Sequence, residues 1–72
     1  MKQIRFHKLD YVTSSVTKNR CPGRVKRCAR DYSWYDVEWN VFRVNRWTSR
    51  EIPKNLNRIN QATAVRLSMA DL

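Results

Sequence analysis

The side chains that could do chemistry in this sequence are mainly cations, and they gather in one segment. Lysine and arginine number 15 against 6 aspartate and glutamate, so the 72 residues carry a formal charge of +9. Residues 1–30 hold nine of these cations and one acid, Asp10. The densest stretch has six cations and no acid: Lys18, Arg20, Arg24, Lys26, Arg27 and Arg30. Like charges this close repel one another and attract a polyanion, so we predict that these six residues bind nucleic-acid phosphates.

A second group of cations follows later in the chain. Arg50, Lys54 and Arg58 are spaced by four residues, which places them on one face if this segment is helical. Asparagine and glutamine are frequent in the same segment, and together with arginine they recognise base edges in the major groove. We therefore predict that Arg50, Lys54 and Arg58 add phosphate or base contacts.

Groups suited to catalysis or metal binding are few. Zinc sites use three or four protein ligands, and this sequence offers only Cys21, Cys28 and His7 as thiol or imidazole ligands. We expect two reduced cysteines, no metal and no cofactor. Asp36 and Glu38 lie on one face of a strand, where we expect them to pair with arginines of a neighbouring strand. A single glycine and the absence of phosphate-loop or nucleophile motifs predict a protein that is not an enzyme.

Some of the eight aromatic residues could stack on nucleic-acid bases. Such stacking needs a ring beside a cation on an exposed sheet surface. Trp47, next to Arg46, and Tyr32 fit this pattern best in the sequence. Tyr35 and Trp39 are expected in the core instead.

The elements that must position these residues are read from hydrophobic periodicity. Ile4 and Phe6 alternate with cations, which predicts a short strand, and Pro22-Gly23 predicts a type II turn. A period of two over residues 31–47 predicts one long strand with Tyr35, Val37, Trp39 and Val41 on its apolar face. Spacings of three and four predict an amphipathic helix after residue 49, in which Leu56, Ile59 and Leu67 face the sheet; the periodic positions are Ile52, Leu56, Ile59, Thr63, Leu67 and Ala70.

These elements amount to one α+β domain over residues 1–72. We predict a β-rich part at 1–47, containing the basic segment 18–30, and a C-terminal helix at 49–70. The sheet is small and antiparallel, with three or four strands and the helix packed on its apolar face. No apolar stretch reaches membrane-spanning length and none resembles a secretory signal, so we expect a cytoplasmic protein without a membrane partner.

The leading functional hypothesis is a non-enzymatic, DNA- or RNA-binding protein with a regulatory role. If about six phosphates are neutralised on duplex DNA, log K falls with log salt concentration at a slope near −5. Two alternatives stay open. The chain could dock a basic and aromatic face on an acidic protein partner and modulate it, or it could be a structural component of a ribonucleoprotein. The choice between DNA and RNA and the existence of a homo-oligomer also stay open.

Overall fold

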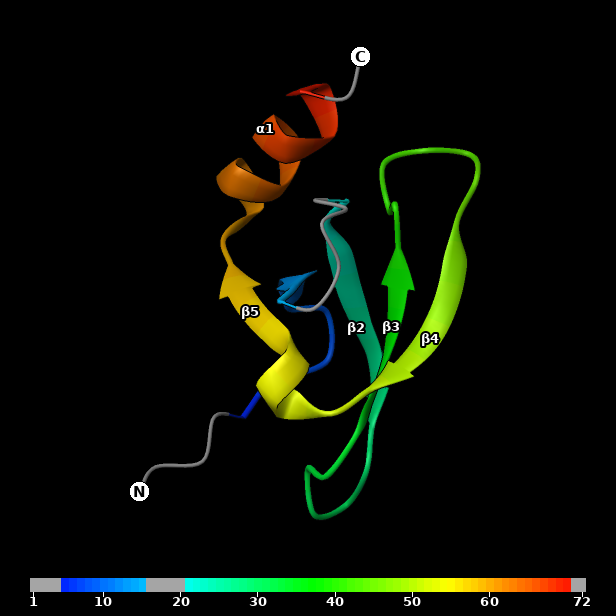
Figure 1. Cartoon of the computed structure of the whole chain (residues 1–72), viewed down its shortest axis with the longest axis vertical. Coiled ribbons are helices and arrows are strands. Elements are labelled where there is room, and N and C mark those ends of the chain that lie inside the picture. The colour runs from blue at the N-terminus through cyan, green and yellow to red at the C-terminus, as the bar shows by residue number, and fades with distance from the viewer. Residues whose placement is uncertain (1–4, 16–20, 71–72) are drawn as a thin grey trace.

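The structure is a computed structural model, and it describes residues 5–15 and 21–70. One antiparallel sheet runs in the order β4-β3-β2-β1-β5, and a single helix follows it (Figure 1). The strands are β1 (Tyr11–Ser14), β2 (Gly23–Cys28), β3 (Tyr35–Trp39), β4 (Trp47–Glu51) and β5 (Leu56–Ile59), with a 3-10 helix η1 (Pro53–Asn55) and the helix α1 (Gln61–Ala70). The predicted α+β class is confirmed, but the sheet has five strands instead of three or four.

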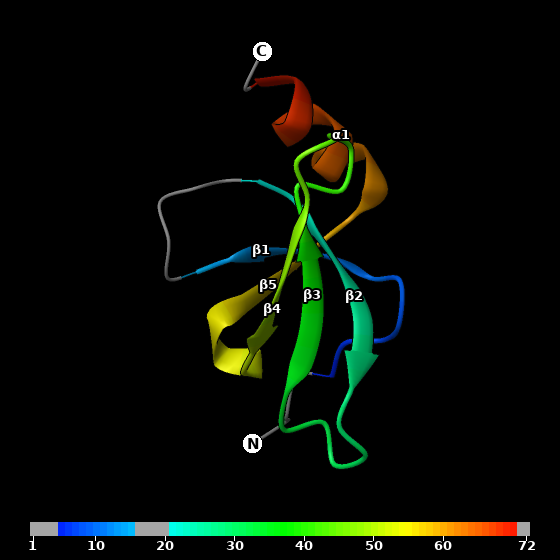
Figure 2. The ribbon, with the colours of Figure 1, turned by 90° about the vertical axis from the view of Figure 1, so that its right-hand side faces the viewer.

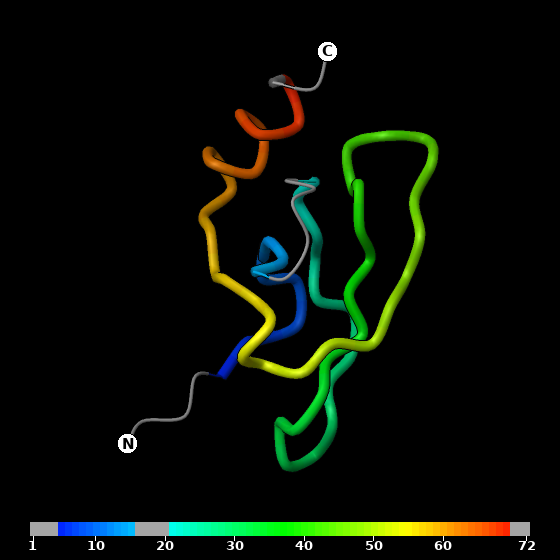
Figure 3. The backbone as a smooth tube through the Cα atoms, in the orientation of Figure 1, coloured from blue at the N-terminus to red at the C-terminus, as the bar shows by residue number. Residues whose placement is uncertain are grey.

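Three strands form a meander, and the other two complete the sheet beside it. β2 pairs with β3 and β3 with β4, whereas β1 pairs with both β2 and β5. After β4 the chain crosses to the far edge of the sheet through η1 and returns beside β1 as β5 (Figure 3). The first and last strands are therefore neighbours.

The core is built by the strands and by one residue that precedes them. Its cluster consists of Phe6, Val12, Val25, Tyr35, Val37, Trp39 and Leu56. The predicted burial of alternate residues in β3 is confirmed. Phe6 is buried from a segment that is not a strand, so the predicted strand at this residue is wrong, and Ile4 lies outside the described residues. The backbone N–H of Phe6 donates to the Tyr35 hydroxyl at 3.1 Å, and the Phe6 ring packs edge-on against the Tyr35 ring.

Gly23 does not form the predicted turn. It is the first residue of β2, and its φ is not positive. A Cβ atom at this position would lie 2.5 Å from Cε3 of Trp39 and 2.6 Å from Cγ1 of Val37. Glycine is therefore needed for close approach to two core side chains and not for a left-handed backbone.

The predicted strand over residues 31–47 is two strands with a loop between them. β3 ends at Trp39, because Asn40 adopts a φ of 62° and turns the chain. The Asn40 side chain also donates to the carbonyl of Asn45 at 2.9 Å, which closes the loop 40–46. Asparagine tolerates this left-handed conformation better than most residues.

The predicted helix begins twelve residues too early, because residues 49–60 form the end of β4, η1 and β5. Ile52 precedes a proline and is extended, with φ −90° and ψ 153°. Leu56 and Ile59 pair with Ser14 and Tyr11 of β1, so they reach the sheet as strand residues. The helix starts only after Asn60, whose side-chain oxygen accepts a hydrogen bond from the Thr63 N–H at 2.7 Å.

α1 lies at one end of the sheet, next to β1 (Figures 1 and 2). Its buried residues are Ala64 and Ser68, whereas Leu67 is half-buried and lies outside the core cluster. Arg43 of the loop 40–46 donates to the Ser68 carbonyl at 2.8 Å and joins that loop to the helix. Within the described ranges, no helix is long and apolar enough to cross a membrane.

Candidate nucleic-acid interface

The face of β2, β3 and β4 that points away from the core carries most of the charged side chains of the sheet. Val25 and Val37 are buried, so strand alternation directs their neighbours Arg24, Asp36 and Glu38 to the other side. We call this side the outer face; its members are Arg24, Lys26, Arg27, Trp34, Asp36, Glu38, Thr48 and Arg50. Within residues 5–15 and 21–70, no helix crosses these three strands, so no helix of the described chain covers the outer face (Figure 2).

A β-bulge puts two consecutive cations on this face. The register shifts between Val25 and Arg27, so that Arg27 is opposite Asp36 while Lys26 is the extra residue. Without the extra residue, alternation would direct Arg27 toward the core. The Lys26 ammonium lies 3.9 Å from the Glu38 carboxylate, which places Lys26 on the outer face as well.

Arg50 is held by an acid and by an aromatic ring. Its Nε donates to Oδ1 of Asp36 at 2.9 Å, and its Nη2 lies 3.4 Å from Oδ2. The guanidinium carbon is 3.7 Å from the centre of the Trp34 ring. This confirms that Asp36 pairs with an arginine of a neighbouring strand, while Glu38 pairs with a lysine instead.

The hydrogen bond from Arg50 lowers the pKa of Asp36 below its ordinary value of 3.8, and the nearby charges of Arg50 and Arg27 add to this effect. The same hydrogen bond raises the pKa of Arg50. Because the pKa of Asp36 is lower in the folded state, its ionised form stabilises the fold above about pH 4. That contribution is lost as the pH falls through the folded-state pKa.

Replacing Arg50 with glutamine is expected to return the pKa of Asp36 toward 3.8, because the main cause of the shift is removed. A carboxyl-carbon NMR titration of the wild type and Arg50→Gln measures this change. Asp31 is the internal control, because hydrogen bonds from Ser33 lower its pKa and should persist in the variant. An Asp36 pKa that stays depressed in the variant would show that Arg50 is not the cause.

A second arginine–aromatic contact lies across the outer face. The Arg24 guanidinium is 5.3 Å from the centre of the Tyr11 ring, and Tyr11 stacks with Phe42 at 5.9 Å and an interplanar angle of 19°. Phe42 remains 42% exposed. The buried Arg24 Nε, a hydrogen-bond donor, has no partner among the described residues.

The other predicted binding residues lie on different elements. Arg50, Lys54 and Arg58 do not form one row, because they belong to β4, η1 and β5. Arg58 lies 3.4 Å from the Asp10 carboxylate, donates to the carbonyl of Arg5 and covers the Phe6 ring. Arg30 is exposed in the loop between β2 and β3. Lys18 and Arg20 lie outside the described residues.

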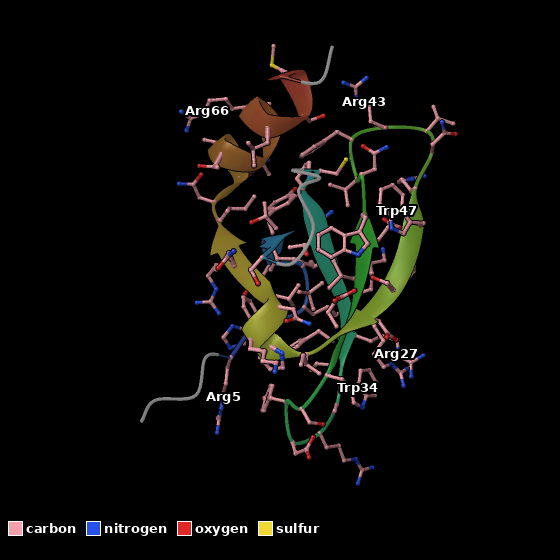
Figure 4. The ribbon with its side chains drawn as sticks, in the orientation of Figure 1. Arg5, Arg27, Trp34, Arg43, Trp47 and Arg66 are labelled. Atoms are coloured by element: carbon pink, nitrogen blue, oxygen red, sulfur yellow. The ribbon has the colours of Figure 1, made fainter. Side chains whose placement is uncertain are left out.

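The two rings predicted to stack on bases are not the ones on the outer face. Tyr32 is partly buried against the core, with Arg5 over its ring at 4.9 Å. Trp47 is 46% exposed, but it is opposite Trp39 and therefore on the core side of β4. Trp34 was missed; the signal for it was that residue 34 continues the alternation of Asp36 and Glu38. Figure 4 shows Trp34 near Arg27, at the end of the sheet away from α1.

Groups for other chemistry are scattered. Cys28 is an exposed free thiol, and Nδ1 of His7 lies 3.7 Å from the Asp10 carboxylate. Across residues 5–15 and 21–70, no three His, Cys, Asp or Glu side chains gather as metal ligands would. A pocket of about 400 Å³ lies at the helix end of the sheet and is lined by Cys21, Asn40, Arg43, Val44 and Asn45.

Comparisons of the chain with protein-family models, with curated proteins and with solved structures found no match.

Proposed function

We propose that the protein is a non-enzymatic nucleic-acid-binding protein whose outer face contacts the phosphates. The observation that supports this proposal is the charge of that face: Arg24, Lys26, Arg27 and Arg50 are four cations, and Asp36 and Glu38 are two acids. Lys26, Arg27 and Arg50 are exposed, so they can reach a ligand without a change of fold. Side chains of this kind attract a polyanion and fix its position on the surface.

The cations of the outer face have different tasks in this proposal. Arg24, Lys26 and Arg27 supply the phosphate contacts, and Arg30 extends them into the adjoining loop. Arg50 is hydrogen-bonded to Asp36, which compensates its charge, and packs on the Trp34 ring, so it contributes less to phosphate neutralisation. Arg58 contributes less, because Asp10 compensates its charge.

Direct titration tests the proposal. The protein is expected to bind a fluorescently labelled 16-mer oligonucleotide at 50 mM salt, measured by anisotropy. If Arg24, Lys26 and Arg27 alone neutralise phosphates, the slope of log K against log salt concentration is about −3 on a duplex. Absence of binding to both single-stranded and duplex oligonucleotides at 50 mM salt would contradict the proposal.

A second candidate function is docking on an acidic protein partner. It draws on the loop 40–46 and the residue after it, where Val44 is 93% exposed and Trp47 46% exposed, with Arg43 and Arg46 beside them. Exposed tryptophan and arginine often carry the energy of protein interfaces. An association that survives nuclease treatment of a cell extract favours this candidate, and one that is lost favours nucleic acid. Cooperative folding of the isolated chain would count against the ribonucleoprotein alternative.

A further inference from the structure

Two aromatic sites flank the cations of the outer face. Trp34 lies just before β3 at one end, and Tyr11 with Phe42 lies at the other. Tyr11 is opposite Arg24, and Arg24 is opposite Glu38, four residues beyond Trp34. Strand rise and strand spacing then put the two sites about 16 Å apart, with the β2 cations between them.

Each aromatic site carries an arginine on its ring. Arg50 lies 3.7 Å from the centre of the Trp34 ring, and Arg24 lies 5.3 Å from that of Tyr11. Rings and planar guanidinium groups are the surfaces on which unpaired bases stack. The Asp36 carboxylate fixes the Arg50 plane, so little conformational freedom remains to be lost when a base arrives.

A duplex cannot use these surfaces. Its bases are stacked on one another, and only their edges are accessible in the grooves. In a duplex, no base face is therefore available to stack on Trp34 or on the Tyr11–Phe42 pair.

We infer that the outer face binds single-stranded nucleic acid, with unpaired bases stacked at Trp34 and at the Tyr11–Phe42 pair and with the intervening phosphates on Arg24, Lys26 and Arg27. This inference rests on the proposed function. The aromatic spacing of about 16 Å fits a strand of a few nucleotides.

Three ligands with equal numbers of phosphates test the inference on the unaltered protein. A 12-nucleotide single strand, in DNA and RNA versions, is compared with an abasic strand of the same length and with a duplex of the same total phosphate count. Stacking at two sites, worth about 10-fold each, predicts that the strands with bases bind about 100-fold more tightly than the abasic strand. It also predicts that they bind more tightly than the duplex in 150 mM salt, where phosphate contacts are weakened.

Aromatic variants identify the stacking sites. Trp34→Leu and Phe42→Leu are each expected to weaken binding of the strand with bases about 10-fold, and to leave binding of the abasic strand unchanged. Trp34→Phe keeps a ring and should retain most of the affinity. Trp47→Leu is the matched control, because this exposed ring is on the core side of β4 and its loss should change neither ligand.

The outcomes separate the inference from the proposed function. Equal affinity for the abasic strand and the strand with bases, or a preference for the duplex, would overturn single-strand stacking and leave phosphate binding intact. Normal binding by both leucine variants at positions 34 and 42 would overturn the assigned sites. Failure to bind any of the three ligands would overturn the proposed function as well.

Discussion

Replacing Gly23 with alanine is expected to lower the free energy of unfolding by about 3 kcal/mol and Tm by about 10–20 °C. The new Cβ would lie 2.5 Å from Cε3 of Trp39 and 2.6 Å from Cγ1 of Val37. Neither neighbour can move away freely: Val37 is fully buried, and the Trp39 indole donates to the Ser49 hydroxyl at 2.7 Å. The free energy of unfolding of a domain of this size is only about 4–10 kcal/mol, so the loss is a large part of it.

Thermal and urea denaturation measure this effect, and a double-mutant cycle assigns it. Trp39→Leu opens space beside Gly23. The double variant should therefore lose clearly less free energy of unfolding than the sum of the losses in the two single variants. Strict additivity, or a change within 0.5 kcal/mol for Gly23→Ala alone, would mean that close packing is not the reason for glycine at this position.

The meander could be predicted from the sequence better than the edges of the sheet. In β3 the residues Tyr35, Val37 and Trp39 alternate with acids, and one face is fully buried, so local pattern and structure agree. β5 is only four residues long, and its apolar ends, Leu56 and Ile59, are spaced by three as in a helix. Its extended form depends on pairing with β1, a contact distant in sequence. Short strands of this kind carry little periodicity of their own.

The candidate site could be predicted as a set of charges but not as a surface. Arg24, Lys26 and Arg27 are evident from charge density alone. The bulge that puts Lys26 and Arg27 on one face is a matter of register with β3, which composition does not reveal. The grouping of Lys54 and Arg58 with Arg50 depended on a helix that does not form there, so it was wrong.

Reversing the charge of two outer-face cations is expected to abolish most nucleic-acid binding. Lys26→Glu with Arg27→Glu removes two attractions and adds two repulsions beside Asp36 and Glu38, which predicts a loss of about 100-fold in affinity at 100 mM salt. Arg46→Glu with Arg66→Glu is the matched control. The control changes the net charge by the same amount, but at other places. Arg46 is an exposed loop residue, and Arg66 is on the helix, far from the Arg27 end of the sheet (Figure 4).

Long-range attraction alone should cost the control variant only a few-fold in affinity, because the Debye length is about 10 Å at this salt concentration. Circular dichroism checks that both variants fold. The Lys26→Gln/Arg27→Gln variant removes the same two cations but adds no acids beside Asp36 and Glu38. It should lose affinity as well, but less than the glutamate variant.

The most direct test of an outer-face interface is one anisotropy titration of a labelled 12-nucleotide single strand at 100 mM salt. It compares the wild type, the Lys26→Glu/Arg27→Glu variant and the Arg46→Glu/Arg66→Glu variant side by side. An interface on the outer face predicts that the first variant loses about 100-fold and the second only a few-fold. Equal losses in the two variants, or a larger loss in the second, would contradict it.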